Sequence, residues 1–150
     1  MEMEEGFALT KSLDGMWSIV PDPDNRGMSE RWYEAYPQED ALPAPVPGQV
    51  HMSLPDYQGE VWYRTSFSCD GLRPGYPRAL IRFGSVDFAC RVWLNGKDLG
   101  WHEGGETPFS LEAGDALRRG ENELIVRVII PVGGDHPLEG LSLFETPCFC

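Results

Sequence analysis

The chain has 150 residues, a formal net charge of −12 and a pI near 4.5. This length is typical of one domain with a real hydrophobic core, and so acidic a surface repels the phosphates of nucleic acids and of anionic membranes. No apolar run approaches the roughly 18 residues that a membrane-spanning helix needs. The first five residues, Met-Glu-Met-Glu-Glu, lack the basic start of a signal peptide. We therefore expect a globular, cytoplasmic protein that binds neither nucleic acid nor membrane.

The 17 glycines and 13 prolines divide the chain into short segments and argue against long helices. Alternating apolar residues predict strands over residues 16–20, 61–68, 79–83, 88–94, 97–101, 107–111 and 123–130. Residues 29–36 fit either a short helix or a strand, and we favour irregular structure with a helical turn. Residues 37–47 carry four prolines and are expected to form an extended surface connection. Residues 51–59 are predicted to be a loop, and residues 115–120 one helical turn.

Asn95-Gly96 is the strongest local signal in the chain. Apolar and β-favouring residues flank it on both sides. A two-residue type I′ turn needs positive φ at both central positions, and asparagine and glycine tolerate this conformation. We therefore predict a β-hairpin here. Together with the other short strands it indicates an all-β fold, an antiparallel β-sandwich or jelly roll.

The four cysteines divide into two pairs. Cys69 and Cys90 lie in or at the end of predicted strands, where we expect buried free thiols. Cys148 and Cys150 are two residues apart, which is poor geometry for a disulfide and does not match the ligand spacing of a zinc finger.

Three groups of motifs follow one another along the chain. The first is Gly59-Glu-Val-Trp-Tyr-Arg64; the second is Phe83-Gly-Ser-Val-Asp87 with Val92-Trp-Leu-Asn-Gly96; the third is Gly104-Gly-Glu-Thr-Pro-Phe109 with Leu117-Arg-Arg-Gly-Glu-Asn-Glu-Leu124. This series resembles the N-terminal sugar-binding domain of glycoside hydrolase family 2, the β-galactosidases, β-glucuronidases and β-mannosidases. The resemblance covers about residues 9–132.

The resemblance implies a jelly-roll, galactose-binding-like sandwich that precedes an immunoglobulin-like domain and a catalytic (β/α)₈ barrel. In such enzymes two glutamates on the barrel carry out retaining hydrolysis, so we expect no catalytic residue in these 150 residues. We divide the chain into a tail (residues 1–12), the sandwich (residues 13–132) and a loop toward a missing final strand (residues 133–150). A sheet that lacks its closing strand exposes unpaired backbone groups, which favours homo-oligomer formation.

The resemblance also implies that two loops approach the sugar in the active site. One contains Asp56, Tyr57, Gln58 and Glu60, and the other contains Asp135 and His136. Polar groups at fixed positions there would pair with sugar hydroxyls. The alternative for each residue is an ordinary solvated loop position. Trp62, Trp93 and Trp101 are more consistent with core or interface packing than with stacking on a sugar.

We expect no metal or cofactor. His51, His102 and His136 are scattered without ligand spacing, and Gly104-Gly105 is followed by neither a helix nor the Gly-Lys-Ser/Thr of a phosphate loop. Three functions remain: the non-catalytic domain of a family 2 glycoside hydrolase, with carbohydrate and the remaining enzyme domains as partners; a free-standing carbohydrate-binding module; or a scaffold that binds no sugar.

Overall fold

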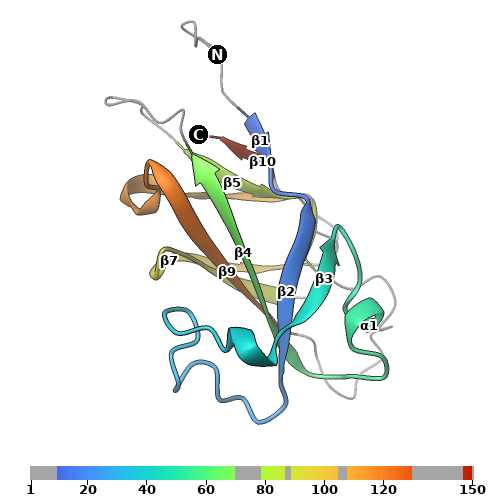
Figure 1. Ribbon diagram of the computed structural model, residues 1–150. Helices are drawn as coiled ribbons and strands as arrows, with labels where there is room; N and C mark the ends of the chain where they lie inside the picture. The colour runs from blue at the N-terminus through green and yellow to red at the C-terminus, as the bar shows by residue number, and fades with distance from the viewer. Residues whose placement is uncertain (1–9, 70–78, 87–88, 105–107, 130–146, 150) are drawn as a thin grey trace, which may run out of the picture.

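The computed structural model describes residues 10–69, 79–86, 89–104, 108–129 and 147–149, which form two antiparallel β-sheets (Figure 1). The larger sheet consists, in spatial order, of β3 (Leu42–Val46), β2 (Gly15–Asp22), β4 (Glu60–Cys69), β9 (Gly120–Ile129), β6 (Ala89–Leu94) and β7 (Lys97–Glu103). The smaller sheet consists of β1 (Thr10–Ser12), β10 (Pro147–Phe149), β5 (Leu80–Phe83) and β8 (Phe109–Glu112). Three short helices connect strands: α1 (Val50–Ser53), η1 (Gln38–Asp40) and η2 (Gly114–Ala116). The predicted all-β sandwich is confirmed.

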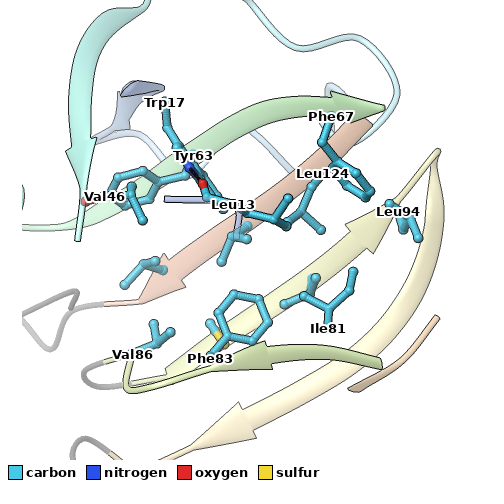
Figure 2. Packing of buried hydrophobic residues seen from close by; sticks show 14 of the residues in the cluster. Leu13, Trp17, Val46, Tyr63, Phe67, Ile81, Phe83, Val86, Leu94 and Leu124 are labelled. Carbon is cyan, nitrogen blue, oxygen red and sulfur yellow. Dashed lines mark hydrogen bonds between the residues drawn. The ribbon is translucent and has the colours of Figure 1, made fainter. Parts of the chain in front are cut away.

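The main core lies between the two sheets. Residues two apart on a strand share a face, so Tyr63 and Phe67 of β4 point inward. Figure 2 shows their side chains approaching Ile81 and Phe83, which come from β5 of the smaller sheet. The inner face predicted for β4 is therefore confirmed, as is that of β9 over Leu124, Val126 and Val128, whereas Ile130 lies outside the described residues.

A second apolar cluster covers part of the outer face of the larger sheet. It is built from Val20, Trp32, Trp62, Trp93 and Ile125. The Trp62 and Trp93 rings stack with centroids 5.2 Å apart, and Trp32 meets Trp62 edge to face at 5.7 Å. Residues of the connection between β2 and β3 cover this face. The predicted helical turn near residues 29–36 contributes Trp32, which packs against Trp62. Trp62 and Trp93 are core residues as predicted, whereas Trp101 on β7 is 44% exposed.

The Asn95-Gly96 hairpin joins β6 to β7 as predicted. The φ angles are +52° at Asn95 and +83° at Gly96, the signs that a type I′ turn requires. The Asn95 side chain also reaches beyond its own turn, because its Nδ2 donates to the backbone oxygen of Ala116 and to Oδ1 of Asn122. The turn is therefore tied to the start of β9.

The structure differs from the sequence expectations at both ends of the chain. Part of the expected tail forms β1, and three residues of the expected loop over residues 133–150 form β10. β10 lies between β1 and β5 and pairs with both, so a strand is present where the sequence predicted a missing one. The backbone groups of two neighbouring edges favour such an inserted strand because it satisfies their hydrogen bonds.

Two connections also contain more regular structure than expected. The proline-rich segment forms η1 and then β3, which pairs with β2 from Ile19↔Leu42 to Gly15↔Val46. Proline is tolerated there because β3 is an edge strand. The loop predicted over residues 51–59 begins with the last three residues of α1. None of the helices in the described ranges has the length and apolar character needed to cross a membrane.

Cys69 and Cys90 are buried free thiols, as predicted. Burial raises the pKa of the Cys90 thiol to about 12, so the thiol stays protonated at neutral pH. Cys148 lies in β10 and Cys150 lies outside the described residues.

Gly27 is expected to tolerate no side chain. A Cβ atom added there would lie 2.4 Å from Cε2 of Trp62, and the Gly27 N–H already donates to Oδ2 of Asp22 at 2.8 Å. We expect Gly27→Ala to lower the free energy of unfolding by about 3 kcal/mol, because the rigid indole has no room to move. Urea unfolding followed by far-UV circular dichroism measures this change. In a Trp62→Leu background the same substitution should cost much less, and equal costs in both backgrounds would contradict the steric explanation.

Candidate functional site

One end of the larger sheet carries the loop before β4, one of the two loops that the sequence singled out. The register pairs Asp22 at the end of β2 with Glu60 at the start of β4, and Val61 with Val128 near the end of β9. The segment before β4 therefore ends beside the last residues of β9. We call the described residues 22–27 and 54–60, together with Ile129, the loop end.

Tyr57 is held inside the loop end. Its hydroxyl donates to the backbone oxygen of Glu60 at 2.7 Å, and its half-buried ring contacts the main core. Burial raises the pKa of the phenol, so it remains a neutral donor at physiological pH. The turn that allows this contact uses positive φ at Asp56 (+61°) and at Gly59 (+138°). Tyr57 thus stiffens the loop from within.

Glu60 is also engaged by a protein partner. Its Oε2 accepts from Nε and Nη2 of Arg127 at 3.0 and 2.7 Å, and the two side chains are only 18% and 12% exposed. The same Nη2 donates to Oδ1 of Asn25 at 3.1 Å, and the guanidinium lies 5.9 Å from the centre of a Trp62 ring. Arg127 of β9 therefore connects two segments of the loop end, residues 22–27 and 54–60, to the sheet.

Gln58 differs from its neighbours because its side chain is exposed and has no hydrogen-bond partner in the part of the chain that the structure describes. Asp135 and His136 lie outside the described residues. The structure therefore brings Tyr57, Gln58 and Glu60 together at one end of the sheet and commits the polar groups of two of them internally. The ion-pair partner Arg127 was missed because it lies 67 residues from Glu60.

Comparison with known proteins now gives the family. The model of the "Glycosyl hydrolases family 2, sugar binding domain" matches residues 47–135. The chain belongs to this family. The expected resemblance to the N-terminal sugar-binding domain of these enzymes is confirmed.

The similar proteins and the solved structure described next are all β-glucuronidases. A β-glucuronidase from Paenibacillus borealis is 36% identical over 107 residues, which cover 68% of this chain and 18% of the relative. Human β-glucuronidase is 31% identical over 137 residues, which cover 81% of this chain and 21% of the relative. The structure of a β-glucuronidase from an uncultured Clostridium sp. has a TM-score of 0.77 and 28% identity, covering 100% of this chain and 30% of that one. The chain thus spans about a fifth of the length of the curated relatives it matches.

This family 2 domain offers no metal centre in its described ranges, where no group of three or more His, Cys, Asp or Glu side chains converges. His51 is exposed on α1. His102 stacks on Phe109 with ring centroids 3.7 Å apart, and its Nδ1 is buried without a hydrogen-bond partner. His136 lies outside the described residues.

A pair of hollows that was not predicted from the sequence lies at the opposite end of the larger sheet. One has a volume of about 470 Å³ and the other about 400 Å³, and both are lined by Ser66 and Glu121. Of the predicted sugar-contact residues, the three that the structure describes, Tyr57, Gln58 and Glu60, line neither hollow. A signal was present in the sequence, because Arg64, Ser66 and Ser68 alternate on the outer face of β4. We call the two adjoining hollows the outer trough.

The Glu60–Arg127 pair is expected to stabilise this domain measurably. Glu60→Gln removes one charge of a pair that is mostly buried, so we expect a loss of about 1.5–3 kcal/mol in the free energy of unfolding. The matched control is Glu34→Gln, because Glu34 pairs with Arg31 at 2.9 Å while both side chains are about half exposed or more. Solvent screens an exposed pair, so Glu34→Gln should change the stability much less than Glu60→Gln. Equal losses in the two variants, measured by urea unfolding, would contradict the assignment.

Proposed function

We propose that this chain serves as the sugar-binding domain of a family 2 glycoside hydrolase that acts on β-glucuronides. The observation that carries the proposal is the match to the family model, together with relatives that are named β-glucuronidases. In this proposal the hydrolytic residues belong to other domains of the enzyme. This chain supports those domains and supplies one wall of the substrate pocket.

The loop end is the part of the chain that we assign to this wall. Tyr57 and Glu60 hold the backbone of residues 57–60 in place, and Gln58 presents an amide that both donates and accepts hydrogen bonds. A rigid loop that carries one free polar side chain suits contact with sugar hydroxyls, because folding has already ordered the loop and binding loses little further conformational entropy. Asp135 and His136 follow β9 in the sequence, outside the described residues, and belong to the same proposal.

A domain exchange tests the proposal. In the Paenibacillus borealis β-glucuronidase, the segment aligned with this chain is replaced by residues 1–150, and hydrolysis of 4-nitrophenyl β-D-glucuronide is measured. We expect the chimera to hydrolyse this substrate and to prefer it over the corresponding β-galactoside. A folded chimera that assembles as the parent does but hydrolyses neither substrate would overturn the proposal.

Within the active chimera, Gln58→Ala tests the loop end. We expect the KM for the glucuronide to rise by about tenfold or less while kcat changes little, as for a lost hydrogen bond to bound substrate. Gln38→Ala is the matched control, since Gln38 lies on η1 and its side chain donates to Oγ of Ser18. A KM that is unchanged by Gln58→Ala would remove this residue from the substrate wall.

We further propose that the protein resides in the cytoplasm and that it self-associates. Support for the first comes from the buried free thiols Cys69 and Cys90, which suit a reducing compartment. Support for the second comes from the edge strand β7, which carries the exposed Trp101. Cell fractionation checks the location, and a sedimentation coefficient that stays monomeric at high concentration would exclude self-association.

A further inference from the structure

The outer trough is open to solvent and lies on the uncovered part of the larger sheet. The β2–β3 connection forms one wall through Tyr33 and Glu34, and the floor carries the Arg64–Glu123 ion pair at 2.8 Å. Beyond Ser66 and Glu121 the trough continues past Asp14 and Met16. Each hollow falls within the volume range of about 300–1,000 Å³ that is typical of small-molecule sites.

Free hydrogen-bonding groups line the trough. The Arg118 guanidinium, the Ser66 hydroxyl and the Glu121 carboxylate have no protein partner among the described residues. The first is a donor, the second both donates and accepts, and the third accepts. These groups project from the region before β9, from β4 and from β9, so their spacing is set by the rigid sheet.

The backbone of Ser66 adds a second donor and acceptor. Both backbone groups of Glu123 bond to Asn95, since the Glu123 N–H donates to Oδ1 and the Asn95 N–H donates to the Glu123 oxygen. Ser66 is paired with Glu123 in the antiparallel register. Because the backbone of Glu123 bonds to Asn95 and not to Ser66, Ser66 and Glu123 form a non-hydrogen-bonded pair. The N–H and C=O of Ser66 therefore point away from β9, toward β2.

β2 does not meet these groups. Its register with β4 ends at Ser18↔Arg64, and its first residues pair with β3 alone. The strands separate here, and the smaller hollow occupies the space between them. Within the described residues the Ser66 amide and carbonyl thus open into the hollow, beside the contact that Lys11 Nζ makes to the Ser68 oxygen.

The charges in the trough favour a neutral ligand. Its lining holds four acidic and three basic side chains, so it is close to balanced although the whole chain carries −12. They are Asp14, Glu34, Glu121, Glu123, Lys11, Arg64 and Arg118. A polyanion would meet an excess of carboxylates, and an apolar peptide would find few anchors apart from Met16 and Tyr33. Mixed donors and acceptors at fixed spacing suit a ligand that is rich in hydroxyl groups.

We propose that the outer trough is a second carbohydrate site, which binds a neutral oligosaccharide long enough to span both hollows. It is separate from the loop end and does not depend on the hydrolytic activity proposed above. Its effect in the whole enzyme would be to hold a glycan chain on the surface of this domain, away from the loops that face the substrate.

The test uses the 150-residue chain labelled with ¹⁵N and titrated with three neutral probes, cellohexaose, xylohexaose and laminarihexaose. We expect saturable shifts of the Ser66, Arg118 and Glu121 amides with at least one probe. Ser66→Trp, which fills the junction of the hollows, and Arg118→Ala should each weaken that binding by about tenfold or more. Gln58→Ala, at the loop end, should leave the affinity unchanged, and the spectra of all variants report whether the fold is intact.

Three results would overturn the proposal. They are the absence of saturable shifts with all three probes at about 10 mM, shifts confined to residues 56–60, and a folded Ser66→Trp variant that binds as the unmodified chain does. The domain exchange described above has a separate readout, hydrolysis of a glucuronide, so the failure of one proposal is distinguishable from the failure of the other.

Discussion

Replacing Trp62 with alanine is expected to lower the free energy of unfolding by about 3–5 kcal/mol. Trp62 has no exposed surface, although it lies on the outer face of the larger sheet. Its ring is enclosed by Trp32 on one side and stacks on Trp93 on another. Truncation would open a cavity that these rigid rings cannot fill by small shifts, and the remaining contacts would be lost outright.

The loss extends beyond packing because the indole also satisfies a buried charge. Trp62 Nε1 donates to Oδ2 of Asp22 at 3.0 Å, and Asp22 is only 2% exposed. The same carboxylate accepts from the backbone N–H groups of Arg26 and Gly27. Removing one of three donors weakens the solvation of a buried charge, so the β2–β3 connection is expected to loosen together with the ring stack.

Urea unfolding followed by far-UV circular dichroism measures the effect independently of tryptophan fluorescence. Trp62→Phe should give an intermediate loss, because it keeps an aromatic ring but not the Nε1 donor. The matched control is Trp101→Ala, since Trp101 is 44% exposed on an edge strand. A Trp101→Ala loss as large as that of Trp62→Ala would contradict the assignment of Trp62 as the centre of the second cluster.

The inner faces of the strands were predictable because their signal is local. The alternation that places Tyr63 and Phe67 in the core is present in β4 itself, and the Asn95-Gly96 turn depends only on what φ its two residues tolerate. The cover on the outer face was harder to predict. It depends on Trp32 and Tyr36 of a connection without regular alternation meeting Trp62, about 30 residues away in the chain.

The contacts of the candidate site were also hard to predict, because they join residues that are far apart in the sequence. The position of Tyr57, Gln58 and Glu60 just before the strand predicted over residues 61–68 was enough to place them at a sheet end. Nothing in the local sequence indicates that the Glu60 carboxylate forms an ion pair with Arg127, a residue of a different strand. The outer trough arises where β2 leaves β4, and a strand pattern specifies faces but not where two paired strands separate.

The two ends of the larger sheet thus differ in whether their polar side chains have partners within the protein. At the loop end, polar side chains are used internally, and the surface is shaped by a buried ion pair and by Tyr57. At the trough end, one asparagine pair secures the hairpin and the start of β9, which leaves the neighbouring polar groups free. This division matches the two proposals, which require a rigid loop end and a trough whose polar groups face solvent.

Asn122→Ala is expected to lower the free energy of unfolding by about 2–4 kcal/mol. Asn122 is 2% exposed and uses all its hydrogen-bonding capacity. Its Oδ1 accepts from Asn95 Nδ2 at 2.9 Å and from the Arg118 N–H at 2.8 Å. Its Nδ2 donates to the backbone oxygens of Arg118 and Gly120, both at 2.9 Å. Alanine would remove all four bonds, so the Arg118 N–H and the oxygens of Arg118 and Gly120 would lose their Asn122 partner, while Asn95 Nδ2 would keep only its bond to Ala116. Loss of a partner by a partly buried polar group is costly.

Two further variants separate the network from the mere loss of a side chain. Asn122→Asp keeps the acceptor but directs a carboxylate at two carbonyl oxygens, so we expect it to be at least as destabilising as alanine. Glu121→Ala, at the exposed neighbouring position, should change the free energy of unfolding by less than about 0.5 kcal/mol. In a double-mutant cycle, Asn95→Ala and Asn122→Ala should show a coupling energy of about 0.5–3 kcal/mol. Strict additivity of the two losses would mean that the hairpin and β9 are stabilised independently.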